Sequence, residues 1–430
     1  MKNSQFNTFF PYENCIIGYN SLENDFIFLT PELHQLYQQM KSDDVDKLKD
    51  IHPEFYDVLV QKRFFIPNDT DELKLVKDKV HSIDCNPEFF HLIINPTMNC
   101  NFKCWYCYET HIKDSKMGKP EIEKIKKLID NKLSNPAIKY LSIGWFGGEP
   151  LLYFNQVVMP ILEHVRSCID NHNKKIIFQS DFTSNGLLIN EKTLSECTRL
   201  GVRSFQITLD GHRQRHNQVR SVSKEIGSYD RIITNIKSCL KHKLHVTCRI
   251  NLSKETINDD LVLIVQDFTD LTEKEKELIS FSFHQVWQEE TNLNNEILKT
   301  IEYFKSKGLQ TNYARFTDTV QYSCYADKQN QATINFNGDV FKCTARDFKT
   351  ENREGVLTDE GEIVWNKKYI ERMNAKFKNP PCLKCTIMPV CNGSCSQKTI
   401  ENKGKEYCVN GFDEKKKIDI ILEKLIYAIS

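Results

Sequence analysis

The chain has 430 residues, which is enough for two or three domains that each bury a core. Its 58 Lys and Arg residues balance 58 Asp and Glu residues, so net charge gives no reason to expect binding to nucleic acid or to an anionic membrane surface. The N-terminus lacks a basic segment followed by an apolar one, and no apolar run reaches membrane-spanning length. We therefore expect a soluble, cytoplasmic protein, in which clustered cysteines indicate metal binding.

Residues 1–85 are expected to form a small N-terminal domain. Alternating apolar residues at 15–20 and 26–29, separated by a polar turn, predict a hairpin. Thr30 and Pro31 are typical of the N-cap and first turn of a helix. The sequence thus predicts a compact β-then-α arrangement at this end of the chain.

A second helix near Pro53 and a short strand at 63–67 complete the expected domain, and the charged stretch 69–79 is expected to be a linker. The hairpin, helices and final strand resemble the winged-helix-like leader-recognition domain of enzymes that modify ribosomally made peptides. A subdomain that merely packs on its neighbour is the alternative interpretation.

From residue 88 to 310 the sequence alternates between β-rich apolar runs and helical stretches. Six such units predict an α/β fold in which parallel strands wind right-handedly into a partial (β/α)6 barrel. Active sites on such barrels lie at the carboxyl ends of the strands. The expected strands are 90–95, 140–146, 176–182, 204–209, 244–250 and 281–287, and the expected helices include 121–133, 155–171, 191–200 and 229–242.

Three cysteines, Cys100, Cys104 and Cys107, follow the first expected strand at the spacing C-x3-C-x2-C. A [4Fe-4S] cluster takes four ligands, so three thiolates leave one iron without a protein ligand. The alternatives are a zinc site, for which His111 is available, and three buried core thiols. The spacing, with the aromatic Tyr106 just before the last cysteine, resembles the signature of the radical S-adenosylmethionine (radical SAM) family.

This resemblance implies that the amino and carboxylate groups of SAM chelate the open iron. One electron then cleaves SAM into methionine and a 5′-deoxyadenosyl radical, which abstracts a hydrogen atom from an unreactive C–H bond. Small and polar residues after the later strands fall where this family contacts SAM, although the glycines could form ordinary turns and Arg220 a surface salt bridge. The implied SAM contacts are Tyr106, Gly147, Gly148, Glu149, Ser184, Asn185, Asp210, Arg220 and Asn251.

The chain changes character after residue 315. A hairpin is expected over 332–343, and a final helix over 412–429 is expected to cover the barrel. Seven thiols in this region resemble the SPASM pattern, a C-terminal extension of radical SAM enzymes that holds auxiliary [4Fe-4S] clusters. Zinc ribbons are the alternative. The seven are Cys324, Cys343, Cys382, Cys385, Cys391, Cys395 and Cys408.

The SPASM resemblance implies two interleaved ligand sets within residues 315–430. One complete cluster would be held by Cys382, Cys385, Cys391 and Cys408. The other three thiols would leave one iron of a second cluster open, or ligated by Asp318.

Together these features predict a radical SAM/SPASM peptide maturase acting on a ribosomally made precursor peptide. The auxiliary clusters would take up the surplus electron, so the expected product is oxidised, as a thioether or carbon-to-carbon crosslink. The implied cofactors are SAM, one radical SAM [4Fe-4S] cluster and two auxiliary clusters. The implied partners are the peptide and an electron donor of the flavodoxin or ferredoxin type.

Two other functions stay open at this point. A sulfatase-maturating enzyme, which oxidises one Cys or Ser to an aldehyde, shares the region around Arg220. Such enzymes, however, carry a further cysteine a few residues before the one that corresponds to Cys324. In this chain the stretch 317–323 contains no cysteine. The other possibility is a non-catalytic zinc scaffold that binds a peptide.

Overall fold

The computed structural model describes residues 1–41, 45–171, 175–221, 226–291, 293–312, 323–391, 393 and 395–429. The chain divides into two compact units, each built from separate segments. We call them the barrel unit, which is Pro87–Ala314 and Asn330–Tyr369, and the terminal unit, which is Met1–Asn86, Arg315–Gln329 and Ile370–Ser430. Residues 330–369 of the expected third domain therefore belong to the barrel unit.

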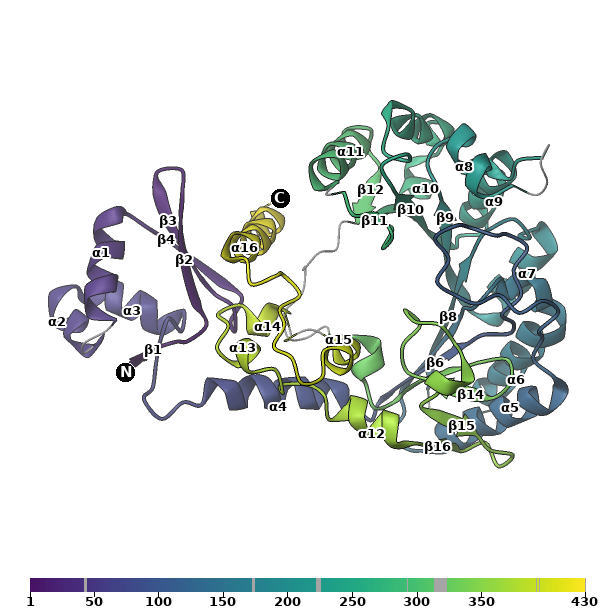
Figure 1. Cartoon of the computed structure of the whole chain (residues 1–430), viewed down its shortest axis with the longest axis horizontal. Helices are drawn as coiled ribbons and strands as arrows, with labels where there is room; N and C mark the ends of the chain where they lie inside the picture. Colours follow the sequence, from purple (N-terminus) through teal and green to yellow (C-terminus); the bar gives the residue numbers. More distant parts are fainter. Residues whose placement is uncertain are drawn as a thin grey trace. The chain divides into compact units, whose positions relative to one another are not determined.

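The barrel unit is organised around one large sheet (Figure 1). Among the described residues, eleven strands form this sheet in the order β12-β11-β10-β9-β8-β7-β6-β13-β14-β15-β16. Neighbours from β13 through β6 to β12 are parallel, and β14 to β16 add antiparallel strands at one edge. The six strands expected from the sequence are all present.

The parallel strands are β6 (Phe89–Ile94), β7 (Tyr140–Trp145), β8 (Ile177–Ser184), β9 (Val202–Leu209), β10 (His245–Leu252), β11 (Ile279–Gln285), β12 (Gln310–Asn312) and β13 (Gln331–Ile334). The antiparallel strands are β14 (Asp339–Phe341), β15 (Gly355–Leu357) and β16 (Ile363–Trp365). The expected hairpin at 332–343 is therefore confirmed, as the pair β13 and β14.

Helices cover the outer face of the barrel sheet (Figure 1). The expected helix 155–171 begins later, at Met159, after two irregular helical turns at Pro150–Tyr153 and Phe154–Val158. Pro160 then lies in its first turn, where a missing N–H costs nothing. The helices of this unit are α5 (Lys119–Leu133), α6 (Met159–Asp170), α7 (Glu191–Leu200), α8 (Arg213–Val219), α9 (Tyr229–Lys241), α10 (Glu273–Lys276) and α11 (Asn294–Ser306).

The two faces of the parallel strands differ in chemistry, because successive side chains point to opposite faces. Buried apolar residues such as Ile143, Phe205 and Ile250 pack with the helices in one core cluster. Most of the residues between them are polar, with Ile93 and Ile177 among the exceptions, and about half are half-buried. Their strand register aligns them in rows, of which Thr183, Gln206, Thr247 and Ser280 form one. We call this polar surface the inner face.

The terminal unit contains a three-stranded antiparallel sheet of β2 (Asn7–Tyr12), β3 (Cys15–Asn20) and β4 (Asp25–Leu29). The expected hairpin and both expected helices are present. The Thr30 hydroxyl accepts a hydrogen bond from the Leu33 N–H and so caps the first helix, as expected from the sequence. The other elements are β1 (Lys2–Asn3), β5 (Phe65–Ile66), α1 (Pro31–Met40), α2 (Leu48–Ile51) and α3 (Pro53–Gln61).

The charged stretch 69–79 is not a simple linker, because most of it belongs to helix α4 (Glu72–Asp84). The Asp71 side chain caps this helix. Val76 and Val80 lie one helical turn apart and are buried against Phe6. A narrow apolar stripe is therefore sufficient to order a segment that is mostly charged.

The C-terminal segment of the terminal unit contains short helices and one long one. Helix α16 was expected to cover the barrel, but its buried residues Ile420, Ile421 and Leu425 pack with Ile17 and Tyr19 of the N-terminal sheet. No helix among the described residues is both long and apolar enough to cross a bilayer. Helix α12 (Lys367–Met373) begins in the barrel unit and ends in this segment. The other helices of the segment are α13 (Pro380–Leu383), α14 (Met388–Cys391), α15 (Ser396–Glu401) and α16 (Glu414–Ile429).

Candidate active site

A cavity of about 190 Å³ lies at the carboxyl ends of the barrel strands. Each strand from β6 to β11 contributes residues to it, either from its last positions or from the loop that follows, as the fold class predicts. Most predicted site residues line this cavity, namely Cys100, Cys104, Tyr106, Cys107, Gly147, Gly148, Ser184, Asn185, Arg220 and Asn251. Glu149 and Asp210 do not line it and lie behind residues that do.

The three thiols sit on the loop after β6, which we call the cluster loop. Burial raises the pKa of Cys100 to about 12 and that of Cys107 to about 11, and it also raises the pKa of Cys104. A neutral thiol is a poor metal ligand, so metal must displace a proton from each sulfur. The Phe102 N–H already points at the Cys100 sulfur at 3.4 Å, as a donor that would stabilise a thiolate.

Neighbouring strand ends hold the cluster loop in place. After β7, the Glu149 N–H donates to the Asn99 carbonyl at 2.9 Å. After β8, the Asn185 amide donates to Asn101 at 2.7 Å. After β11, the Gln288 amide donates to the Tyr106 carbonyl at 3.0 Å. The position of the thiols is therefore set by the whole sheet and not by the loop alone.

The Gly147-Gly148 turn has no room for side chains. Both residues have positive φ, +74° and +46°. A Cβ on Gly147 would lie 2.7 Å from the Asn95 side chain, and one on Gly148 would lie 2.2 Å from the Asn99 carbonyl oxygen. Only glycine allows this close approach between the turn and the cluster loop.

Glu149 connects the loop after β7 to the end of β8 by hydrogen bonds. Its buried carboxylate accepts hydrogen bonds from the Ser184 hydroxyl at 2.9 Å, the Asn185 N–H at 2.8 Å and the Leu151 N–H at 3.0 Å. Burial raises the pKa of this carboxyl group. Its contacts in the described part of the chain make it a positioning residue for Ser184 and Asn185.

Arg220 is buried in an ion pair with Asp210, and not at the surface. The Tyr106 hydroxyl donates to Asp210 at 2.6 Å and accepts from the Arg220 guanidinium at 2.6 Å. Behind this group, His216 accepts from the Asp210 N–H, and burial lowers the pKa of its imidazole to about 3. The network fixes the aromatic ring that precedes Cys107 and leaves Arg220 on the cavity wall.

Glu109 also lines the cavity, although the sequence analysis did not identify it. It lies two residues after Cys107, and one carboxylate oxygen accepts from the Gly148 N–H at 2.9 Å. The other oxygen, Oε1, is buried and has no hydrogen-bond partner among the described residues. Burial raises the pKa of this carboxyl group to about 7.

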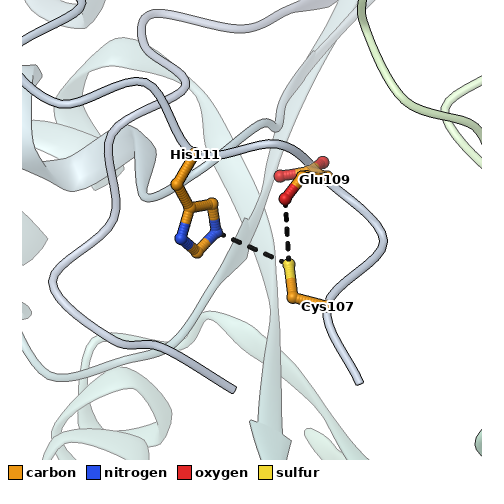
Figure 2. Close-up of side chains that lie close together, drawn as sticks. All are labelled: Cys107, Glu109 and His111. Carbon is orange, nitrogen blue, oxygen red and sulfur yellow. Dashed lines mark hydrogen bonds between the residues drawn. The ribbon is translucent and has the colours of Figure 1, made fainter. Parts of the chain in front are cut away.

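Figure 2 shows Glu109 beside Cys107 and His111. The ligating atoms of these three side chains lie within 4.8 Å of one another, and His111 Nε2 is 3.5 Å from the Cys107 sulfur. Such a group could hold a single metal ion, but Cys100 and Cys104 do not belong to it. A zinc ion here would leave two of the three thiols unused, so a cluster fits the donor set better.

Arg249 and an aromatic pair complete the cavity wall. Arg249 precedes Asn251 by two residues on β10, so both face the cavity, and its Nε donates to the Asn251 amide oxygen at 3.0 Å. Tyr108 and Trp287 stack with ring centroids 5.1 Å apart, and Trp287 is 62% exposed. Strand alternation could have identified Arg249, whereas the aromatic contact depends on folding.

A second group of thiols lines a cavity of about 40 Å³ in the terminal unit. These are the four residues expected to hold a complete cluster, namely Cys382, Cys385, Cys391 and Cys408. The Asn379 amide donates to the Cys382 sulfur at 2.9 Å, and Lys417 also lines the cavity. Four thiols around one cavity equal the number of protein ligands that a [4Fe-4S] cluster takes when it has no external ligand.

The ligands predicted for the second auxiliary cluster are distributed differently. Cys324 and Cys395 belong to the terminal unit, where the Ser396 N–H donates to Asp327 at 3.2 Å. Cys343 belongs to the barrel unit. Asp318 lies outside the described residues. This second ligand set therefore stays a prediction.

The similarity of this chain to known proteins agrees with the three-thiol cavity of the barrel unit. Residues 94–268 match the model of the Radical SAM superfamily. The radical SAM cyclopropyl synthase TigE of Paramaledivibacter caminithermalis is 24% identical over 405 residues, which cover 84% of this chain and 79% of that protein. Its match extends beyond the residues of the family model into both ends of the chain.

Two solved structures share the fold. Native anSMEcpe with bound AdoMet has a TM-score of 0.57 at 18% identity, over 79% of this chain and 97% of that chain. Streptococcus suis SuiB bound to precursor peptide SuiA has a TM-score of 0.55 at 16% identity, over 94% of this chain and 98% of that chain. Three thiols line the cavity at the strand ends of a barrel whose residues 94–268 match the family model, so this chain contains a radical SAM domain.

Proposed function

We propose that this enzyme modifies a ribosomally made precursor peptide by an oxidative crosslink. The observation that carries the proposal is the polar inner face of the barrel sheet, which continues into the cavity through Gln206, Thr208 and Arg249. A peptide presents N–H and C=O groups along its whole length, and each needs a partner when it leaves water. An inner face of hydroxyl, amide and guanidinium groups offers such partners, whereas an apolar barrel interior would not.

The aromatic pair beside the cavity supports a peptide substrate. Tyr108 and Trp287 present exposed ring surface, and the Arg346 guanidinium lies 5.5 Å from the Trp287 ring centroid. Aromatic and guanidinium surfaces of this kind bind side chains that are partly apolar and partly polar. The fold likeness to SuiB with its bound precursor peptide is consistent with the same substrate class.

The residues of the first site have distinct roles in this proposal. Cys100, Cys104 and Cys107 would hold the cluster, and the Gly147-Gly148 turn would let a ligand approach the backbone closely. When bound, the cluster and SAM supply reductive cleavage of SAM and removal of a hydrogen atom from the substrate. Enclosure by the strand-end loops would exclude water and competing reactions.

The four-thiol cavity would hold the electron acceptor. A crosslink removes two hydrogen atoms from the peptide, and deoxyadenosine carries away only one of them. The remaining proton and electron must leave separately, and a fully ligated cluster at Cys382, Cys385, Cys391 and Cys408 would accept the electron. We further propose a flavodoxin or ferredoxin as the initial electron donor, and leader-peptide recognition by residues 1–85.

Mass spectrometry tests the proposal directly. The reduced, iron-loaded enzyme is incubated without oxygen with SAM and short peptides encoded beside its gene. We expect one peptide to lose two hydrogen atoms, and we expect no loss with a Cys104→Ala variant. Product formation only on a sulfatase-derived peptide, with conversion of one Cys or Ser to an aldehyde, would contradict the crosslinking function.

A further inference from the structure

Three side chains on the helices of the barrel unit bring possible metal ligands together outside the cavity. Asp130 lies in the last turn of α5, and His164 and Cys168 lie four residues apart on one face of α6. Asp130 Oδ1 is 2.8 Å from His164 Nε2 and 3.2 Å from the Cys168 sulfur, and the sulfur is 3.4 Å from the same ring nitrogen. We call these three residues the outer ligand group.

The geometry of the outer ligand group does not suit nucleophilic catalysis by the cysteine. In a Cys-His-Asp triad the imidazole contacts the nucleophile with one ring nitrogen and the carboxylate with the other. Here a single nitrogen, His164 Nε2, faces both the Asp130 oxygen and the Cys168 sulfur. One nitrogen, one oxygen and one sulfur atom pointing at a common centre is instead the arrangement of a metal site.

The distances in the outer ligand group are close to those around a tetrahedral zinc ion. With Zn–S bonds of about 2.3 Å and Zn–N and Zn–O bonds of about 2.0–2.2 Å, tetrahedral geometry places ligand atoms about 3.3–3.6 Å apart. The three atoms would therefore separate by only about 0.2–0.5 Å to admit the ion, and small side-chain rotations provide this.

The surroundings of the outer ligand group favour a cation that enters from solvent. The side chains of Asp130 and His164 are 50% and 26% exposed, and within the described ranges His164 is the only ion-pair partner of Asp130. Asp130 and Cys168 each lie in the last turn of a helix, where the helix dipole favours positive charge. The carboxylate is therefore not already neutralised by a lysine or arginine.

We propose that Asp130, His164 and Cys168 bind one zinc ion, with water as its fourth ligand. A thiolate and an imidazole favour zinc over magnesium or calcium, and such sites bind zinc more tightly than ferrous iron. On binding, the Cys168 thiol releases its proton to solvent and the sulfur bonds the metal.

The zinc ion would join α5 to α6, which lie side by side on the barrel (Figure 1). Helices of a β/α barrel return from the carboxyl to the amino ends of the strands, so their last turns lie away from the active site. None of the three ligands lines the cavity. The ion thus stabilises the barrel and takes no part in the reaction, so the inference does not depend on which substrate is modified.

Zinc analysis of the iron-loaded enzyme tests the site, because the cluster thiols are then occupied. The enzyme is equilibrated with zinc sulfate without oxygen, and loosely bound metal is removed by gel filtration. We expect about one zinc per chain, and X-ray absorption at the zinc edge should show one sulfur at about 2.3 Å and nitrogen or oxygen at about 2.0–2.2 Å. This measurement does not detect the iron.

Substitutions then locate the ion. We expect His164→Ala and Cys168→Ser each to weaken zinc binding by at least about 100-fold, since changes to residues that only support a ligand already cost about 10- to 100-fold. Iron content equal to wild type shows that a variant is folded. Asp130→Asn provides a further variant at a half-exposed position, with the same expected loss of zinc.

Cys85→Ser is the matched control. The Cys85 sulfur lies 3.6 Å from His81 Nδ1 at the same four-residue spacing, but this pair belongs to no group of three possible ligands in the part of the chain that the structure describes. The control should keep its zinc. Absence of zinc from wild type, a zinc spectrum without sulfur, or unchanged zinc in folded His164→Ala would overturn the proposal.

Discussion

The two thiol sites of this chain differ in number of ligands and in free space. The barrel site has three thiols beside a cavity of about 190 Å³, and the terminal site has four thiols around about 40 Å³. A [4Fe-4S] cluster needs four ligands, so the first site requires a further ligand and has room for it, whereas the second requires none and has no such room. This difference is what our proposal requires, in which the first site would bind a further ligand and the second would transfer electrons.

The sites also differ in how they are built. The terminal site takes three of its thiols, Cys382, Cys385 and Cys391, from one short segment around α13 and α14. The barrel site depends on hydrogen bonds from the ends of β7, β8 and β11 to the cluster loop. Substitutions remote from the thiols should therefore disturb the barrel site more readily.

Removing one barrel thiol should have the largest effect. Cys104→Ala leaves two thiols, too few to hold the cluster, so we expect deoxyadenosine formation from SAM to fall to background. Iron content should drop by about four atoms per chain, the content of one cluster. Retention of SAM cleavage in this variant would show that the first site is not the reactive one.

Removing one thiol of the terminal site should separate the two functions. In Cys385→Ser we expect deoxyadenosine formation to stay within about tenfold of wild type, about 1.4 kcal/mol in barrier height. We expect the crosslinked peptide to fall to background, because its surplus electron has no acceptor. Deoxyadenosine and the crosslinked peptide are quantified by chromatography from one reaction. Loss of both products together would contradict the separate functions that we propose for the two sites.

Breaking the buried ion pair should weaken the barrel site alone. Asp210→Asn leaves the buried Arg220 guanidinium without its carboxylate, which typically costs about 3–5 kcal/mol in the free energy of unfolding. We expect denaturant unfolding to show this loss in the barrel unit, with the iron of the terminal site retained. An unchanged unfolding curve would mean that the pair contributes little to the fold.

A methyl group at the glycine turn should have a smaller effect. Gly148→Ala places a Cβ 2.2 Å from the Asn99 carbonyl at a φ of +46°, and relief of this strain should cost about 1–3 kcal/mol. Because the turn must shift, SAM should bind more weakly in equilibrium dialysis. Wild-type affinity would indicate that the turn does not contact the ligand.

Much of the barrel and both thiol groups could be predicted from the sequence, because strand alternation and cysteine spacing are local patterns. Glu109 escaped prediction since its importance comes from Gly148, which lies 39 residues away in sequence and reaches it only in the fold. The role of Glu149 was likewise set by Ser184 and Asn185 on another strand.

The terminal unit shows a second limit of sequence reasoning. Helix α4 looked like a linker because its charges outnumber the apolar residues that order it, Val76 and Val80 among them. Helix α16 has an apolar stripe that could pack against any hydrophobic surface. The sequence of the stripe does not indicate that its partner is the N-terminal sheet.

The inner face of the barrel sheet has a consequence for how such an enzyme can change. Residues such as Gln206 and Thr247 are half-buried and make no part of the apolar core, which lies on the helix side of the sheet. Substitutions at half-exposed positions of this kind usually alter stability by about 0.5 kcal/mol or less. Substitutions can therefore change the inner face while the apolar core on the helix side of the sheet stays the same, so one fold can be adapted to many different substrates.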